Sequence, residues 1–303
     1  MQHVVEAIEA LYQRALGRMR EQLSDKGKIS GSKLNARQPG AHGLAYLATE
    51  LEACKQLASW SERVGGELEG RIARAYIGNV ARSVRGGIDL GACELIPVSD
   101  LGLTEKDLAE TVLASNVQAF CDEHASADAV VAIARIAHET GSFGKLGLDD
   151  ETLDDVRGQF AKFVDAEVIP VAQDIHRKDV LIPMEIVSKM SELGVFGLTI
   201  PEEYGGLGMS KVAMCVVTEE LSRGYIGVGS LGTRAEIAAE LILGGGTEEQ
   251  KQKWLPALAS GEVLSTAVFT EPNTGSDLAH LGTRAVKQPD GSYKVHGQKT
   301  WIT

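Results

Sequence analysis

The sequence predicts a mainly helical protein with a β-domain at its carboxyl-terminal end. Three observations lead to this fold class. Apolar residues recur at helical spacing through most of the 303 residues, a Gly-rich stretch at 141–150 separates two helical blocks, and from Val263 the period changes from helical to extended. We therefore expect a helical N-terminal extension over residues 1–147, a helical domain over 148–264 and the start of a β-domain over 265–303.

Composition and charge narrow the class of protein. Apolar residues make up 44% of the chain, which is enough for packed cores, and no apolar run reaches the roughly 18 residues that a membrane-spanning helix needs. The first residues carry acids where a signal peptide would carry bases, so we expect a cytoplasmic protein with no membrane partner. A net charge of −12 argues against nucleic-acid binding, which relies on Lys and Arg facing phosphates.

The cysteines and histidines indicate neither a disulfide framework nor a metal site. Cys54, Cys93, Cys121 and Cys215 are scattered and form no C-x-x-C pair. The seven histidines are equally dispersed, with no metal-ligand spacing such as H-E-x-x-H. We expect the four thiols to pack as small apolar side chains and no metal to be bound.

Residues 1–147 have the pattern of a helical bundle. Val4, Val5, Ile8 and Leu11 open the first helix at helical spacing. Further helices are expected over residues 42–64, 71–90, 104–120 and 128–140. Gly65-Gly66 breaks the first, either Gly86-Gly87 or Gly91 ends the second, a Thr-Glu-Lys-Asp cap at 104–107 opens the third and Gly141 ends the fourth.

Residues 30–40 form a turn-rich loop between the first two helices. Lys33, Arg37 and free backbone amides would allow this loop to contact a phosphate. The alternative, which we expect, is a solvated connector.

The second block begins at Asp149 or Asp150, whose acidic side chains suit a helix N-terminus. Its helices are expected over residues 150–168 (before Pro170), 182–193, 211–222, 230–243 and from a capping box at 247–250. Beyond Val263, residues 284–288 and 293–296 have the pattern of strand, turn and strand.

Two segments near the end of the sequence suit a flat, hydrogen-bonding cofactor such as a flavin. A polar, Gly-containing turn closes one expected strand at 270–277, and Trp301, Ile302 and Thr303 end another. An ordinary β-turn with a core tryptophan is the alternative for each segment alone.

Four motifs then occur in order. They are GLTIPEEYGGLG at 197–208, GTEEQKQKWLP at 246–256, TEPNTGSD at 270–277 and GQKTWIT at 297–303. Together they resemble the acyl-CoA dehydrogenases over about residues 150–303. The resemblance implies the N-terminal helical domain of that family and the start of its β-barrel-like middle domain, without the C-terminal helical bundle.

The resemblance also implies FAD as cofactor, and a reaction that removes the α-proton of an acyl-CoA and passes the β-hydrogen to the flavin as hydride. The residues implied as flavin contacts are Phe269, Thr270, Gly275, Ser276, Trp301, Ile302 and Thr303. Ser276 would reach either a flavin phosphate or the pantetheine of the substrate. Thr274 and Phe269 depart from the residues usual in the family, which affects the shape of the pocket more than its hydrogen bonding.

Glu271 is a carboxylate beside the implied cofactor, but we do not expect it to be the general base. In the family the base lies further along the chain, so no catalytic residue is expected within these 303 residues. Glu271 is expected to anchor the turn through hydrogen bonds.

Arg234 is a candidate substrate-binding residue. By resemblance its helix borders the acyl pocket, and a dicarboxylic acyl group needs a cation, which Arg supplies bidentately. Its own helix offers no acidic partner, since Ile237 and Ala238 hold the facing positions. The alternative is an arginine that is solvated or paired with an acid elsewhere.

Within the family, an added domain before residue 150 is most similar to the methylsuccinyl-CoA dehydrogenases of the ethylmalonyl-CoA pathway, which make mesaconyl-CoA. The resemblance implies electron-transfer flavoprotein as electron acceptor and a homo-oligomer, either dimer or tetramer. An acyl-CoA oxidase or flavin monooxygenase on the same scaffold, or a non-catalytic fragment, remain the alternatives.

Overall fold

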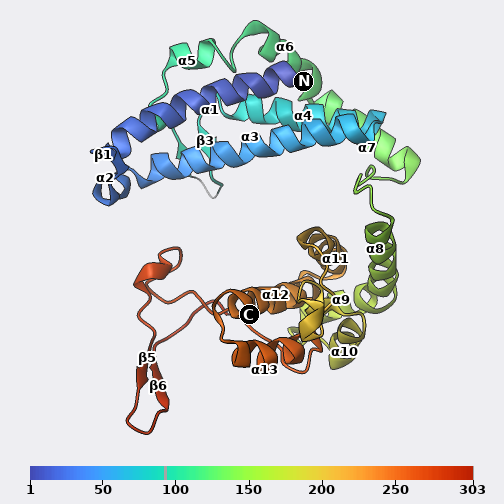
Figure 1. Ribbon diagram of the computed structural model, residues 1–303. Coiled ribbons are helices and arrows are strands. Elements are labelled where there is room, and N and C mark those ends of the chain that lie inside the picture. Colours follow the sequence, from blue (N-terminus) through green and yellow to red (C-terminus); the bar gives the residue numbers. More distant parts are fainter. Residues whose placement is uncertain (92–93, 303) are drawn as a thin grey trace. The chain divides into compact units, whose positions relative to one another are not determined.

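The chain forms two compact units, Met1–Gly147 and Leu148–Thr303, in the computed structural model (Figure 1). The structure describes residues 1–91 and 94–302. Helices dominate both units, and the strands are few and short, which confirms the mainly helical fold class. Among the residues described, every helix is too short or too polar to traverse a bilayer.

Three long helices form the centre of the first unit: α1 (Gln2–Leu23), α3 (Gln38–Val64) and α4 (Glu67–Ser83). They lie side by side, as Figure 1 shows. The buried residues of α1 recur every three or four positions from Val4 to Leu23, so one apolar stripe of the helix faces its neighbours. Burial of such stripes, which carry mostly aliphatic side chains, is the main stabilising term for this unit.

Smaller elements surround these helices. They are β1 (Ser24–Asp25), β2 (Lys28–Ile29), α2 (Gly31–Asn35), β3 (Ile88–Asp89), β4 (Leu95–Ile96), the 3₁₀ turn η1 (Val98–Leu101), α5 (Glu105–Ala109), α6 (Ser115–His124) and α7 (Ala127–Thr140). Gly141 ends α7 in the left-handed conformation, at the position that the sequence predicted.

The helix predicted over 71–90 was too long. Helix α4 ends at Ser83, and the chain then turns through Gly86 and Gly87 into the β3–β4 hairpin. Gly87 has φ +132°, and a Cβ there would lie 2.6 Å from the carbonyl oxygen of Ile96. The close approach of the two strands therefore requires glycine and ends the helical run.

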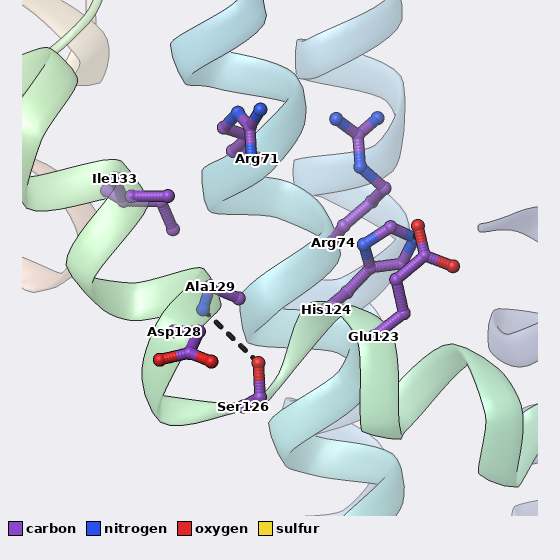
Figure 2. Close-up of a pocket in the computed structure, with 9 residues that line it drawn as sticks. Arg71, Arg74, Glu123, His124, Ser126, Asp128, Ala129 and Ile133 are labelled. Atoms are coloured by element: carbon purple, nitrogen blue, oxygen red, sulfur yellow. Dashed lines mark hydrogen bonds and ion pairs between the residues drawn. The ribbon is translucent and has the colours of Figure 1, made fainter.

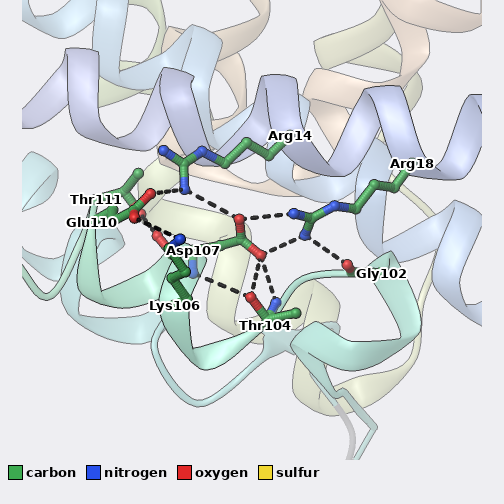
Figure 3. Close-up of polar contacts among 8 residues, drawn as sticks. All are labelled: Arg14, Arg18, Gly102, Thr104, Lys106, Asp107, Glu110 and Thr111. Atoms are coloured by element: carbon green, nitrogen blue, oxygen red, sulfur yellow. Dashed lines mark hydrogen bonds and ion pairs between the residues drawn. The ribbon is translucent and has the colours of Figure 1, made fainter.

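The single helix predicted over 104–120 was also wrong, because two helices, α5 and α6, occupy this region. The predicted cap is present: Thr104 and Asp107 form a capping box at the start of α5. Asp107 is buried and also accepts hydrogen bonds from Arg14 and Arg18 of α1 (Figure 3). This tertiary pairing fixes the short helix where propensity alone would continue it.

The second unit contains six α-helices among the described residues. They are α8 (Glu151–Phe163), α9 (Ile169–Lys178), α10 (Met184–Glu192), α11 (Lys211–Gly224), α12 (Ile226–Gly245) and α13 (Glu248–Ala259). Asp150 caps α8 by accepting from the amides of Thr152 and Leu153, and Thr247 caps α13 in the predicted capping box. Their apolar faces meet in two clusters of buried residues.

The expectation that a helix stops before Pro170 was wrong. A π-helical turn, η2 (Val164–Val168), leads directly into α9, with Pro170 in the first turn. Proline has no amide to donate, and it is accommodated where the hydrogen-bond pattern changes, since the Ile169 amide donates to the Val164 carbonyl across five residues. Glycine at 224 lets α11 approach this turn, since a Cβ would lie 2.7 Å from Val164.

The loop at 197–208 folds back on itself through the short 3₁₀ turns η3 (Val195–Gly197) and η4 (Glu202–Tyr204). The amides of Leu207 and Gly208 donate to the carbonyls of Gly197 and Ile200 at 2.8 and 2.9 Å. Tyr204 is buried and donates to Glu248 of α13 at 3.0 Å. The motif thus joins the loop to the helix that carries the next motif.

The final segment contains one antiparallel hairpin, β5 (Arg284–Lys287) with β6 (Tyr293–His296), preceded by the 3₁₀ turn η5 (Leu278–His280). Every residue of both strands is exposed. The strands expected around Val263 and at 301–303 are not formed within the described residues, because the hairpin has no neighbouring strand there with which they could pair.

Candidate functional site

The turn at 271–274 is closed by two backbone hydrogen bonds. The amide of Glu271 donates to Thr274 at 2.8 Å, and the amide of Thr274 donates back at 3.1 Å. Phe269, Gly275 and Ser276 are exposed beside this turn, and Thr270 is half-buried. A Cβ built on Gly275 would meet no atom within 4 Å. The turn therefore presents an aromatic ring, hydroxyl groups and an open stretch of backbone to its surroundings.

The segment at 297–302 is held against this turn. The amide of Thr300 donates to the carbonyl of Thr270 at 3.1 Å, and Lys299 Nζ donates to the carbonyl of Phe269 at 2.9 Å. These bonds bring Phe269 and Thr270 together with the segment that carries Trp301 and Ile302. The predicted contact Thr303 lies outside the described residues.

Trp301 is not a core residue in this chain. Its side chain is 88% exposed, and its φ of +60° places the backbone in the left-handed region, which is uncommon for a residue with a large side chain. The exposed indole offers a flat apolar face to a ligand. The two halves of the predicted contact set thus form one exposed surface, defined here as the 269–276/297–302 surface.

Glu271 lies beneath this surface and ties it together. Its carboxylate accepts from the amides of Gly282 and Thr283 at 2.7 and 2.9 Å and from Lys299 Nζ at 2.9 Å. The Thr283 side chain, Lys299 and the two amides lower the pKa of Glu271 to about 2. These hydrogen bonds confirm the anchoring role expected for Glu271, and a carboxyl group of so low a pKa is a poor base near neutral pH.

Lys299 was missed by the sequence-based prediction. It lies two residues before Trp301, and its side chain is only 21% exposed. A signal was available, since a lysine between predicted cofactor contacts and 28 residues from an expected anchoring glutamate is a candidate partner. Sequence spacing alone cannot pair residues across a hairpin whose register is unknown.

Arg234 lies in the middle of α12 and is half-buried. Its carbonyl accepts from Ser265 Oγ at 3.0 Å, which links the helix to the chain that leads to the 271–274 turn. In the part of the chain that the structure describes, its guanidinium makes no hydrogen bond or ion pair, whereas nearby Glu236 is paired with Lys211. Arg234 therefore keeps the donors that a carboxylate ligand would require.

The first unit contains a hollow of about 570 Å³ between α4, α6 and the start of α7 (Figure 2). Arg71 and Arg74 face it together with His124, Glu123 and Asp128. Arg71 is already paired with Glu67, and burial lowers the pKa of His124. The lining thus carries both signs of charge, and none of the predicted site residues lies in it.

The remaining sequence-based candidates have structural roles. The loop expected at 30–40 was wrong for most of its length, because α2 and the first residues of α3 occupy it. Lys33 donates to the carbonyl of Ser24 at 2.5 Å, and Ser30 caps α2. Cys54 and Cys121 are buried, and burial raises the pKa of the Cys54 thiol to about 12. The expectation that all four thiols are packed was wrong for Cys215, which is exposed on α11, and Cys93 lies outside the described residues. No cluster of metal-binding side chains is found in the described ranges.

Comparison with known proteins identifies the family of this chain. Residues 150–262 match the model of the acyl-CoA dehydrogenase N-terminal domain. The chain is 50% identical over 301 residues to a (2S)-methylsuccinyl-CoA dehydrogenase of Cereibacter sphaeroides, a match that covers 98% of this chain and 54% of that protein. The chain belongs to the acyl-CoA dehydrogenase family.

Two further relatives each cover about half of this chain. A probable acyl-CoA dehydrogenase of Bacillus subtilis is 39% identical over 142 residues, 46% of this chain and 24% of that protein. The crystal structure of acyl-CoA dehydrogenase from Geobacillus kaustophilus is 37% identical, covers 51% of this chain and 40% of its own, and has a TM-score of 0.46. The chain thus spans about half or less of the length of the relatives that it matches.

Proposed function

We propose that this chain is part of an FAD-dependent acyl-CoA dehydrogenase that oxidises an acyl-CoA thioester between its α and β carbons. The proposed substrate is (2S)-methylsuccinyl-CoA and the proposed product mesaconyl-CoA. The observation that carries the proposal is the similarity to a (2S)-methylsuccinyl-CoA dehydrogenase over 98% of the chain, whereas the other relatives described above cover only about half of it.

The 269–276/297–302 surface fits FAD. Within the described residues, the amides of Gly275 and Ser276 donate to no acceptor, and Phe269 and Trp301 expose aromatic surface next to them. Free amides suit phosphate and carbonyl oxygens, and exposed rings suit the face of an isoalloxazine. When bound, FAD would supply the capacity to accept hydride, and the protein would supply position and polarity.

In this proposal each residue of the surface has a separate task. Thr270 would donate to the pyrimidine end of the flavin, Trp301 and Ile302 would cover its face, and Thr303 would hydrogen-bond near N5. Gly275 allows the close approach of the cofactor, and Ser276 holds a flavin phosphate or the pantetheine of the substrate. Phe269 shapes the edge of the pocket.

The α-proton is removed by a base that we place outside this chain. Glu271 is unsuited to that task, because its carboxylate already accepts hydrogen bonds from two amides and from Lys299. The chain's part in the reaction would be to hold the flavin in position.

Arg234 is the proposed partner of the distal carboxylate of the substrate. Its guanidinium has free donors, and an arginine can bind a carboxylate through two parallel hydrogen bonds. We further propose electron-transfer flavoprotein as the electron acceptor, a homodimer or homotetramer as the assembly and the cytoplasm as its location.

A visible spectrum of the full-length protein tests the proposed function. Addition of methylsuccinyl-CoA without oxygen should bleach the flavin absorption, and butyryl-CoA should bleach it less. A protein that stays colourless after incubation with FAD would contradict the proposal. Rapid oxygen uptake by the substrate-reduced enzyme would instead support an acyl-CoA oxidase or a flavin monooxygenase.

A further inference from the structure

The segment from 260 to 302 has almost no apolar core of its own. Glu271 is the one buried residue among those that the structure describes in this range, and its side chain is 9% exposed. Both strands of the hairpin are exposed, and the apolar clusters of the second unit involve no residue beyond Val263. Among the described residues, the contacts that join the two halves of the 269–276/297–302 surface are hydrogen bonds and an ion pair.

Those contacts converge on the pair formed by Glu271 and Lys299. The Glu271 carboxylate joins the 271–274 turn to the amides that lead into β5, at Gly282 and Thr283. Lys299 Nζ, 2.9 Å from that carboxylate, also donates to the carbonyl of Phe269. Three stretches of chain that are separate in sequence are thus held by two side chains.

Each side chain of the pair stands close to a predicted flavin contact. Lys299 precedes Trp301 by two residues, and Glu271 directly follows Thr270. The Thr300 amide reinforces the same junction by donating to the Thr270 carbonyl at 3.1 Å. A displacement of Lys299 relative to Glu271 would therefore displace the two halves of the surface relative to each other.

We propose that the Glu271–Lys299 ion pair is the positioning element that sets the spacing between the two halves of the FAD-binding surface. The inference rests on the proposed function. Neither residue touches the reacting atoms, so the pair acts through Phe269, Thr270 and the segment that carries Trp301. Its loss should weaken FAD binding much more than it slows turnover of the FAD-loaded enzyme.

The test uses full-length deflavo-enzyme and measures the Kd for FAD by titration of flavin fluorescence. Glu271→Gln and Lys299→Met should each raise the Kd about tenfold or more, because each removes a charge-assisted hydrogen bond. The double variant should lose little beyond the larger single loss, since both changes break one pair. Lys299→Arg should recover most of the affinity. At saturating FAD, kcat should stay within about threefold of the wild-type value.

Matched controls lie in the same segment. Glu262→Gln and Lys287→Met alter exposed side chains, which form no hydrogen bond or ion pair with the residues that the structure describes, and both should leave the Kd unchanged. Far-UV circular dichroism checks that the variants are folded. If Glu271→Gln does not fold, the FAD affinity of Lys299→Met alone tests the positioning role, because this variant leaves the Glu271 carboxylate with its two amide partners.

The outcomes separate this inference from the proposed function. If the wild-type protein binds no FAD, the proposed function is refuted. If the wild-type protein binds FAD and Lys299→Met binds it equally well, only the positioning role is refuted. Equal loss of affinity in Lys299→Arg and Lys299→Met would also overturn it, since a charge at this position would then not matter.

Discussion

Asp107 and Arg18 are joined across 89 residues of sequence, with Arg18 Nη2 2.9 Å from the Asp107 carboxylate. The same carboxylate accepts from Arg14 at 3.1 Å and from the amide of Thr104 at 2.8 Å (Figure 3). One buried acid thus completes the capping box of α5 and attaches that helix to α1.

Replacement of Asp107 by alanine should weaken the attachment of α5 by about 2 kcal/mol. This is less than the loss of a fully buried ion pair costs, because the Arg18 side chain is 37% exposed and solvent screens its charge. Hydrogen exchange of peptides from α1 and α5 should then be roughly 30-fold faster. Asp122→Ala is the control, since Asp122 is 79% exposed and 3.6 Å from Arg82. Equal effects of the two substitutions would show that the Asp107 network does not stabilise the unit.

The contribution of Asp107 should depend on pH with a definite sign. Arg18, together with Thr104 and Arg14, holds the pKa of Asp107 well below its ordinary value of 3.8. A depressed pKa gives stability that is fully present above the ordinary value and is lost as the pH falls below it. The difference in thermal stability between wild type and Asp107→Asn should be constant from about pH 5 to 8 and shrink below about pH 4. A difference that grows on acidification would contradict this reading.

Arg234→Ala should distinguish two substrates of the full-length enzyme. We expect kcat/KM for methylsuccinyl-CoA to fall at least about tenfold more than kcat/KM for butyryl-CoA, because only the former offers a second carboxylate. The kcat/KM of Arg234→Lys for methylsuccinyl-CoA should lie between those of the wild type and Arg234→Ala, since lysine keeps the charge and loses the planar guanidinium. Equal losses on both substrates would exclude a carboxylate-specific role.

Gly206→Ala should destabilise the second unit by about 3 kcal/mol. An added Cβ would lie 2.0 Å from the carbonyl oxygen of Ile200, and backbone cannot move aside as a flexible side chain can. Gly244→Ala, in α12, is the control: no atom lies within 4 Å of its Cβ, and alanine favours a helix, so stability should be unchanged or slightly higher. Chemical denaturation followed by circular dichroism would measure both, and a Gly206→Ala protein as stable as wild type would rule out the close packing of this loop.

Signals that are local in sequence predicted the structure well. Thr104, Asp150, Thr247 and Gly141 cap the helices at which they were expected, because a cap is decided by residues within one turn of it. Helix continuity was less predictable. The π-helical turn before Pro170 and the break after Ala109 depend on neighbours distant in sequence, such as Gly224 and Arg18.

The candidate site was predictable in part for the same reason. The residues proposed as flavin contacts could be named from the sequence motifs, and the anchoring role of Glu271 could be predicted from its place in a turn. Lys299 could not be paired with Glu271, because their contact depends on how the chain returns after the hairpin. The donors left free on Arg234 also depend on tertiary packing, which places Lys211 on Glu236 instead.

The scarcity of buried side chains between 260 and 302 has a thermodynamic consequence. Heat capacity and denaturant sensitivity both scale with the apolar surface that unfolding exposes, and this segment would expose little that is not already in contact with water. Calorimetry and urea titration of this chain would therefore measure the unfolding of the helices and would change little when the contacts of Glu271 are lost. Amide exchange at Gly282 and Thr283, whose protons point at that carboxylate, is the measurement that would detect it.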